Sequence, residues 1–390
     1  MTAITTPQPS KTPRFHALDG LRGAAALLVV FVHMRVSFEF MNWANHVTGP
    51  RFVRNGFIAV DLFFMLSGLV IAANYSERIG SLPDIYRFMR LRFFRLYPLH
   101  FLMLLGFVAF EFIKLIAISG GGQTASPAFS GPQSIAALVA NLFLVQAWHL
   151  FPLMGYNVLS WSISCEVGAY IGFALLAYMG LVRKRIFGPL GIVSIIACYV
   201  GLLLSPRGLD STADWGLLRC WAAFTLGMFI WRYLPVDKMP VSRILHSSVQ
   251  VFTLVALAVV MTLFNGNMLM FAMPLFFVLI ATLQTGQGVI ADLLETQPLQ
   301  RLGRISYSVY MVHSFLLVSL TLVSTRLLHM PLSETRAPDA LSALGNPWVG
   351  DVLAAGIVAV VFGVAALTFR YVEEPGRLYG KRTTVNPGSP

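Results

Sequence analysis

The chain has 390 residues, of which 56% are hydrophobic and only 12% are charged. Soluble domains carry about 25% charged residues, so this composition excludes a soluble fold and predicts an all-α polytopic membrane protein. The formal net charge of +11 would suit nucleic acid, but the basic residues cluster in alternate loops, as the positive-inside rule predicts, and we expect no nucleic-acid partner.

The N-terminal residues 1–15 are polar and rich in Pro and Thr, and we expect them to form a disordered cytosolic segment. No small-residue cleavage site follows the first apolar run, so that run is predicted to stay as a membrane helix and not to act as a signal peptide. A membrane-embedded domain is predicted over 16–376, with a cytosolic tail over 377–390.

Apolar segments of about 18–23 residues predict helices that cross the bilayer. About ten such segments occur, near 18–38, 56–75, 96–117, 157–181, 188–205, 216–234, 246–264, 268–285, 305–326 and 349–371. The segment 134–150 is ambiguous, and we interpret it as re-entrant or interfacial, because a spanning 134–150 would place the basic cluster at 183–185 outside the cell. This choice predicts that both termini are cytosolic.

The first apolar segment contains two ionisable side chains, Arg22 and His33. An arginine at mid-membrane costs on the order of 3 kcal/mol, so such residues usually face a cavity or a partner. Eleven residues at about 1.5 Å each separate the two by roughly 16 Å, about half a bilayer. The spacing predicts one group at the cytosolic face and the other deep in the membrane.

Two acids lie within other predicted spans, Asp61 in the second and Glu166 in the fourth. A histidine with a nearby acid is the usual arrangement of a general base, so His33, Asp61 and Glu166 are candidate catalytic residues. Alternatives stay open for each. His33 would otherwise be a buried imidazole bonded to a helix carbonyl, and Asp61 or Glu166 a structural partner of an arginine or of backbone amides.

The densest cytosolic charge, RFMRLRFFRLYP, holds Arg87, Arg90, Arg92 and Arg95. Arginine forks match phosphate oxygens bidentately, and Arg92 and Arg95 share a helix face because they are three residues apart. With Arg22 they would form a phosphate clamp at the inner surface. The competing interpretation is topology anchoring together with contact to anionic lipids.

Other polar residues give weaker predictions. His313, about eight residues into the ninth span, suits either packing or function, and Ser67-Gly68 is predicted to permit close helix approach. Glu111 and Lys114 are predicted to pair on one helix face. The cysteines Cys165, Cys198 and Cys220 lie in apolar segments with no CxxC or Cys/His cluster, so neither a disulfide nor a metal site is predicted.

Six motifs stand in order along the chain: LDGLRGAAALLVVFVH, AVDLFFMLSGLVI, RFFRLYPLH, LSWSISCEVGAYI, GRISYSVYMVH and YVEEP. In this order they resemble the acyltransferase-3 family of membrane-bound O-acyltransferases, from about residue 14 to 376. The resemblance implies that His33, in the family's Arg-x10-His pattern with Arg22, is the catalytic residue. It also implies that Arg92 and Arg95 hold acyl-CoA phosphates.

Two further family patterns fall on this chain. The WSxxxE stretch matches Trp161, Ser162 and Glu166, and the ExP pattern matches Glu373. Many relatives continue after the first pattern with a second acid and a Gln, whereas 167–168 is Val-Gly here, so a role for that second acid does not apply. Family members often carry a fused extracytoplasmic esterase-like domain, and since this sequence shows none, we expect transfer to the final acceptor at the membrane site.

The expected function is transfer of an acyl group, most simply acetyl, from cytosolic acetyl-CoA or another acyl-CoA to a hydroxyl of an extracytoplasmic glycan or glycolipid. His33 would be the general base, oriented by Asp61 or Glu166. Ser67, Trp161, Ser162, His313 and Glu373 are candidate supporting residues, and Arg22, Arg90, Arg92 and Arg95 are candidate acyl-CoA ligands. No metal is expected, and the oligomeric state stays open.

Two alternatives remain beside this interpretation. One is acylation of a small molecule such as a macrolide. The other is a secondary transporter, since intramembrane His and acids suit proton pathways as well. Against transport, we find no paired Gly/Pro-broken helices in two repeated halves. The resemblance implies a bacterial protein of the inner (plasma) membrane.

Overall fold

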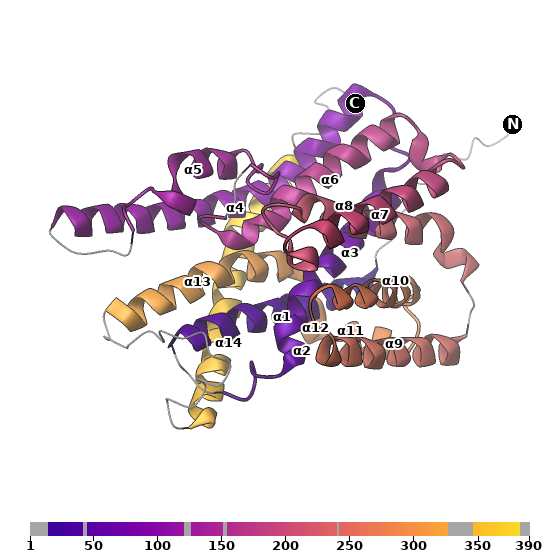
Figure 1. Cartoon of the computed structure of the whole chain (residues 1–390). Helices are drawn as coiled ribbons and strands as arrows, with labels where there is room; N and C mark the ends of the chain where they lie inside the picture. The colour runs from indigo at the N-terminus through magenta and orange to yellow at the C-terminus, as the bar shows by residue number, and fades with distance from the viewer. Residues whose placement is uncertain are drawn as a thin grey trace, which may run out of the picture.

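The computed structural model describes residues 15–41, 45–120, 126–150, 154–239, 242–326 and 346–382, and these residues form helices joined by short turns (Figure 1). The predicted all-α fold class is confirmed, since no strand occurs in the described ranges. The segments predicted as a disordered N-terminus and as the last part of the C-terminal tail, 1–14 and 383–390, lie outside the described residues.

Fifteen α-helices are described in these ranges. They are α1 (His16–Met41), α2 (Arg51–Arg54), α3 (Ala59–Tyr75), α4 (Leu82–Ser119), α5 (Ile135–Leu142), α6 (Trp161–Tyr178), α7 (Phe187–Leu204), α8 (Gly216–Tyr233), α9 (Arg243–Leu263), α10 (Ala272–Leu283), α11 (Val289–Leu294), α12 (Gln297–Arg304), α13 (Ser306–Arg326), α14 (Pro347–Thr368) and α15 (Glu374–Arg382). A π-helical turn, Phe369–Glu373, joins the last two, so residues 377–382 of the predicted tail are helical.

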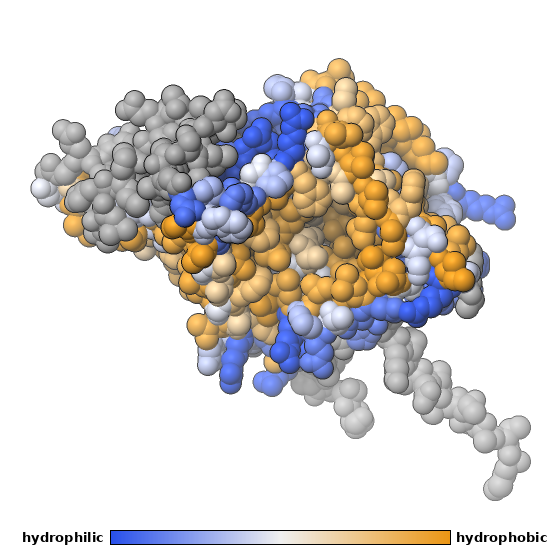
Figure 2. Space-filling model, turned by 90° about the horizontal axis from the view of Figure 1, so that it is seen from below, coloured by the Kyte–Doolittle hydropathy of each residue, from blue (hydrophilic) through white to orange (hydrophobic). Residues whose placement is uncertain are grey.

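Nine helical segments of the described chain are long and apolar enough to cross a membrane. They coincide with nine of the predicted spans, and Figure 2 shows a largely apolar face with hydrophilic side chains gathered toward its edges. The remaining predicted span, 216–234, forms α8 at the expected place but contains Arg219 and Arg232. Because α8 packs against α3, α6, α7 and α10, protein surrounds much of it and it needs less apolar surface than a lipid-facing helix.

The segment 134–150 contains no helix long enough to cross the bilayer, which agrees with its prediction as re-entrant or interfacial. Its helix, α5, has 8 residues and is about 12 Å long, far short of the hydrocarbon core. Ile135, Val139 and Phe143 are exposed and follow one another at intervals of four, which gives α5 one outward apolar face. Such a face suits a helix that lies in the membrane interface beside α4 (Figure 1).

Helices α3 and α8 pack closely against each other. A Cβ placed on Gly68 would lie 2.0 Å from the Phe224 carbonyl oxygen, and one on Gly227 would lie 2.0 Å from the Met65 carbonyl oxygen. The two backbones therefore touch at both glycines, a contact that small residues permit in membranes. This confirms the close approach predicted at Ser67-Gly68.

A buried ion pair fastens the same two helices. The Arg219 Nε donates to both carboxylate oxygens of Asp61, at 2.8 and 3.0 Å, and Nη2 donates to Oδ2 at 2.5 Å. The two side chains are only 1% and 3% exposed. Arg219 also donates to the carbonyl oxygens of Phe57 and Ser211, at 3.2 and 3.4 Å, so its charge is surrounded by acceptors.

Replacing Asp61 by Asn should destabilise the protein by about 3–5 kcal/mol, because it leaves the buried Arg219 charge without its counter-ion. Thermal unfolding in detergent measures this. The matched control is Asp292→Asn, which breaks the exposed Arg243–Asp292 pair and should cost no more than about 1 kcal/mol. Equal unfolding temperatures for the two variants would contradict the structural role of the buried pair.

Gly227→Ala should force α3 and α8 apart, since the new methyl group would overlap the Met65 carbonyl oxygen. Overpacking of this kind costs about 1–3 kcal/mol or more. Gly356→Ala on α14 is the control, because nothing lies within 4 Å of a Cβ there. We expect a lowered unfolding temperature for the first variant alone, and the interpretation fails if both behave like the parent protein.

Candidate active site

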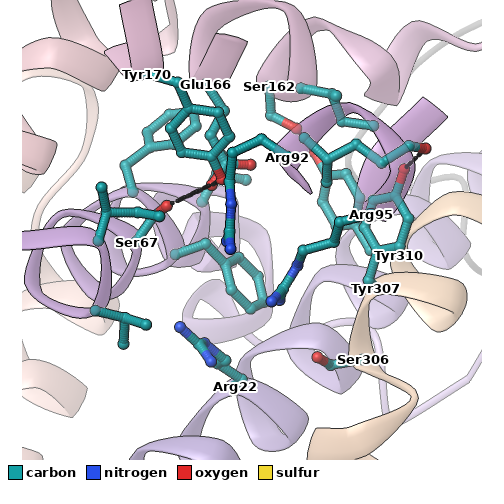
Figure 3. A pocket seen from close by; sticks show the side chains of 17 residues that line it. Arg22, Ser67, Arg92, Arg95, Ser162, Glu166, Tyr170, Ser306, Tyr307 and Tyr310 are labelled. Carbon is teal, nitrogen blue, oxygen red and sulfur yellow. Dashed lines mark hydrogen bonds between the residues drawn. The ribbon is translucent and has the colours of Figure 1, made fainter. Parts of the chain in front are cut away.

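A pocket opens between α1, α3, α4, α6 and α13 (Figure 3). Its empty space, including the part open to solvent, is about 790 Å³. Its lining combines apolar side chains, most of them on α3, with hydroxyl, carboxylate and guanidinium groups. The lining residues are Arg22, Val60, Phe63, Phe64, Ser67, Val70, Ile71, Arg92, Arg95, Leu96, Ser162, Ile163, Glu166, Tyr170, Ser306, Tyr307 and Tyr310.

Three arginines extend into this pocket from two helices, Arg22 from α1 and Arg92 and Arg95 from α4 (Figure 3). Arg22 Nη1 donates to Asp19 Oδ1 at 3.3 Å, and Arg92 Nη2 donates to the Tyr75 hydroxyl at 2.9 Å. The buried Arg92 Nε has no hydrogen-bond acceptor within the described chain. Three positive groups with donors to spare form a site that an anion with several oxygens would fill.

The geometry of α4 places its two arginines. The helix begins with a capping box between Ser81 and Asp84 and continues without a break for 38 residues, through Pro98. Arg92 and Arg95 share one face of it, and the Arg92 guanidinium lies 5.2 Å from the centre of the Tyr75 ring, which holds it over the pocket. The third predicted ligand on this helix, Arg90, lies over the Phe94 ring at 5.8 Å and is not part of the lining.

Glu166 faces the same pocket. Its Oε1 accepts hydrogen bonds from the Ser67 hydroxyl and the Tyr170 hydroxyl, both at 2.5 Å (Figure 3). The structure therefore groups this carboxylate with the arginines. It does not place it against His33, the partner considered for it from the sequence. Tyr170 is a site residue that sequence reasoning missed, although its position four residues after Glu166 puts both on one face of α6.

The WSxxxE stretch divides between two sites. Ser162 and Glu166 line the pocket, whereas Trp161 packs its ring against the Arg219 guanidinium at 5.4 Å and against Phe64. Asp61 is held by Arg219, which was the structural alternative considered for it. Arg219 was missed as a site residue, and its only signal in the sequence is that it is an arginine near the start of a predicted membrane span.

His33 lies next to another histidine. Its Nδ1 is 2.9 Å from the Val29 carbonyl oxygen and 3.3 Å from the Nε2 of His313, which is fully buried. The ring of Tyr310 connects this pair with the pocket, since it lies 6.0 Å from the His313 ring and also lines the pocket. The Ser162 hydroxyl donates to the Tyr310 hydroxyl at 2.8 Å, so a fixed tyrosine lies between the arginines and the two histidines.

Glu373 lies outside the pocket and connects α13, one of the helices around it, to the C-terminal helices. It is buried in the π-helical turn and accepts a hydrogen bond from the Ser308 hydroxyl of α13 at 2.6 Å. The following helix, α15, packs against α4, where the Phe94 and Tyr379 rings are in contact. Glu373 thus joins α13 to the C-terminal helices and does not line the pocket. No group of three or more His, Cys, Asp or Glu in the described ranges is arranged to hold a metal ion.

Several known proteins that are similar to this chain are named as acyltransferases. YrhL of Bacillus subtilis, a candidate peptidoglycan O-acetyltransferase, is 25% identical over 403 residues, or 94% of this chain and 55% of its own. The peptidoglycan O-acetyltransferase OatA of Listeria monocytogenes is 24% identical over 408 residues, or 93% of this chain and 56% of its own. The acyltransferase MdmB of Streptomyces mycarofaciens is 34% identical over 178 residues, or 45% of this chain and 42% of its own.

This chain spans about half the length of these curated relatives. No solved structure matches it. The family described as "Acyltransferase domain" matches residues 15–368, which include all five helices that line the pocket. The chain therefore belongs to the acyltransferase-3 family that its six motifs resemble.

Proposed function

We propose that this protein transfers an acetyl group from cytosolic acetyl-CoA to a hydroxyl of an extracytoplasmic glycan or glycolipid, with His33 as the general base. The observation that carries the proposal is the convergence of Arg22, Arg92 and Arg95 in one pocket, together with the His33–His313 pair next to Tyr310, which lines that pocket. The pocket supplies a donor site, and the histidine pair supplies a base at the depth where an acyl group would arrive.

The chemistry of the donor matches the arginines. Coenzyme A carries a diphosphate and a 3′-phosphate, and arginine is the side chain best suited to bind such groups bidentately. Arg22 and His33 are separated by about 16 Å along the axis of α1. An extended pantetheine arm has a comparable length, so phosphates held at the arginines would leave the thioester near His33. Apolar side chains of the pocket, including Phe63 and Phe64, would enclose the arm.

The reaction follows from the orientation of His33. Because Nδ1 faces the Val29 carbonyl oxygen, it carries the ring proton, and Nε2 is left as the free base. Nε2 takes the proton of the acceptor hydroxyl while that oxygen attacks the thioester carbonyl carbon. The C–S bond then breaks, the proton on His33 passes to the departing sulfur, and the products are an O-acetyl ester and free coenzyme A.

The proposal also includes the acceptor and the orientation of the protein in the membrane. Two relatives are named as peptidoglycan O-acetyltransferases, which supports a cell-envelope glycan as acceptor and the bacterial inner membrane as location. The start of α1 reaches the pocket at Arg22, and α15 packs on the same part of α4 that carries Arg92 and Arg95. Both ends of the bundle thus lie at the donor side, which supports cytosolic termini.

Arg92→Gln and Arg95→Gln should each weaken coenzyme A binding by about 10- to 100-fold, since a hydrogen bond to a charged group contributes about 1.5–3 kcal/mol. Titration calorimetry of the purified protein with acetyl-CoA measures the affinity. Arg87→Gln is the matched control, because this residue is exposed on the same helix outside the pocket. Unchanged affinity in both pocket variants would remove the donor site.

His33→Ala should lower acetyl transfer by at least about 100-fold and leave the affinity for acetyl-CoA unchanged, because it removes the base and not the phosphate ligands. The assay follows release of free coenzyme A thiol with a soluble muropeptide as acceptor probe, and mass spectrometry detects the acetylated product. Transfer by this variant at the parent rate would refute a catalytic His33.

A further inference from the structure

We infer that His313 is a positioning residue for His33 and fulfils, as a neutral hydrogen-bond acceptor, the role that an acid has in most histidine bases. This inference rests on the proposed function. Its basis is the 3.3 Å separation between His313 Nε2 and His33 Nδ1, two residues that come from α13 and α1, which pack side by side (Figure 1).

Two backbone carbonyl groups fix the protons of the pair. A carbonyl oxygen can only accept, so the ring nitrogen that faces it must carry hydrogen. The His313 Nδ1 is 3.0 Å from the Val309 carbonyl oxygen, one helical turn earlier. His313 therefore donates there and presents the lone pair of its Nε2. The Nδ1–H of His33 lies between the Val29 carbonyl oxygen and that lone pair, and it can be shared by both.

The consequence for His33 is a fixed ring. With Nδ1–H bound on one side by its own helix and on the other by α13, the ring cannot turn freely about its side-chain torsions, and Nε2 keeps one direction. When Nε2 takes the acceptor proton, the resulting imidazolium still has a hydrogen-bond acceptor at Nδ1. This lowers the cost of the charge in a site where solvent is scarce.

The two carboxylates first considered for this role are already engaged. Asp61 binds Arg219, and Glu166 accepts from the hydroxyl groups of Ser67 and Tyr170. Tyr310 is the described side chain that also lies against His313, and its hydroxyl is bonded to Ser162 and to the Leu159 carbonyl oxygen. A neutral partner also avoids a buried carboxylate that would hold His33 permanently as an ion pair.

The experiment compares His313→Leu with His313→Gln. Leu removes the acceptor, whereas the amide oxygen of Gln reaches about where Nε2 lies and can still accept from His33. For the Leu variant we expect kcat to fall by about 100-fold, the cost of a misplaced reacting group, with the KM for acetyl-CoA unchanged. The kcat of the Gln variant should be at least about tenfold higher than the kcat of the Leu variant. Thiol release with the muropeptide probe gives both constants.

The outcomes separate this inference from the proposed function. A His33→Ala variant that is inactive, beside a His313→Leu variant with parent kcat, overturns the role of His313 and leaves the proposed function standing. A Gln variant as slow as the Leu variant also overturns it, since an acceptor would then not be what matters. If the Leu variant does not fold, His313→Gln is compared with His313→Asn, whose shorter side chain cannot reach His33. Equal kcat values for these two variants would overturn the inference.

Discussion

The buried pair of Asp61 and Arg219 is the interaction on which the site depends. It joins α3 to α8 at a level where both charges are almost fully removed from solvent, and the reciprocal glycine contact brings the two backbones together on the same pair of helices. α3 forms one wall of the pocket and supplies Ser67, which holds Glu166. An ion pair that is costly to desolvate gives little net stability, but it strongly penalises any arrangement in which one charge loses its partner. It therefore fixes where α3 stands relative to α6 and α8.

A second constraint is the gathering of positive charge. Arg22, Arg92 and Arg95 share a pocket with one carboxylate, and the buried Nε of Arg92 has no hydrogen-bond acceptor within the described chain. Like charges repel most where the dielectric is low, so an anion bound among the three arginines would relieve their mutual repulsion. The pair of His33 and His313 does not line this pocket and lies beyond Tyr310, away from the three arginines. The arrangement thus separates binding of a charged donor from the base that would act on its uncharged end.

The sequence predicted much of this because the relevant information is local. The lengths of apolar segments gave the helices, and the spacing of Arg92 and Arg95 gave one shared face, which α4 confirms. Partners between helices could not be predicted in the same way. Asp61 and Arg219 are 158 residues apart, and His33 and His313 are 280 residues apart, so their pairing depends on how distant helices pack. For the same reason the structure sets both acids away from His33. The position of Arg90 is different in kind, because residues two apart on a helix do not share a face, and Arg90 therefore lies away from Arg92 on α4.

The central claim is that one donor molecule reaches from the three arginines to His33. The most direct measurement is an experimental structure of the protein with a non-hydrolysable acetyl-CoA analogue, in which a thioether replaces the thioester. The account predicts phosphate oxygens within hydrogen-bonding distance of Arg92 and Arg95, and the acyl end of the analogue beside Nε2 of His33. Phosphates bound away from this pocket, or an acyl end that stays on the arginine side of Tyr310, would contradict it.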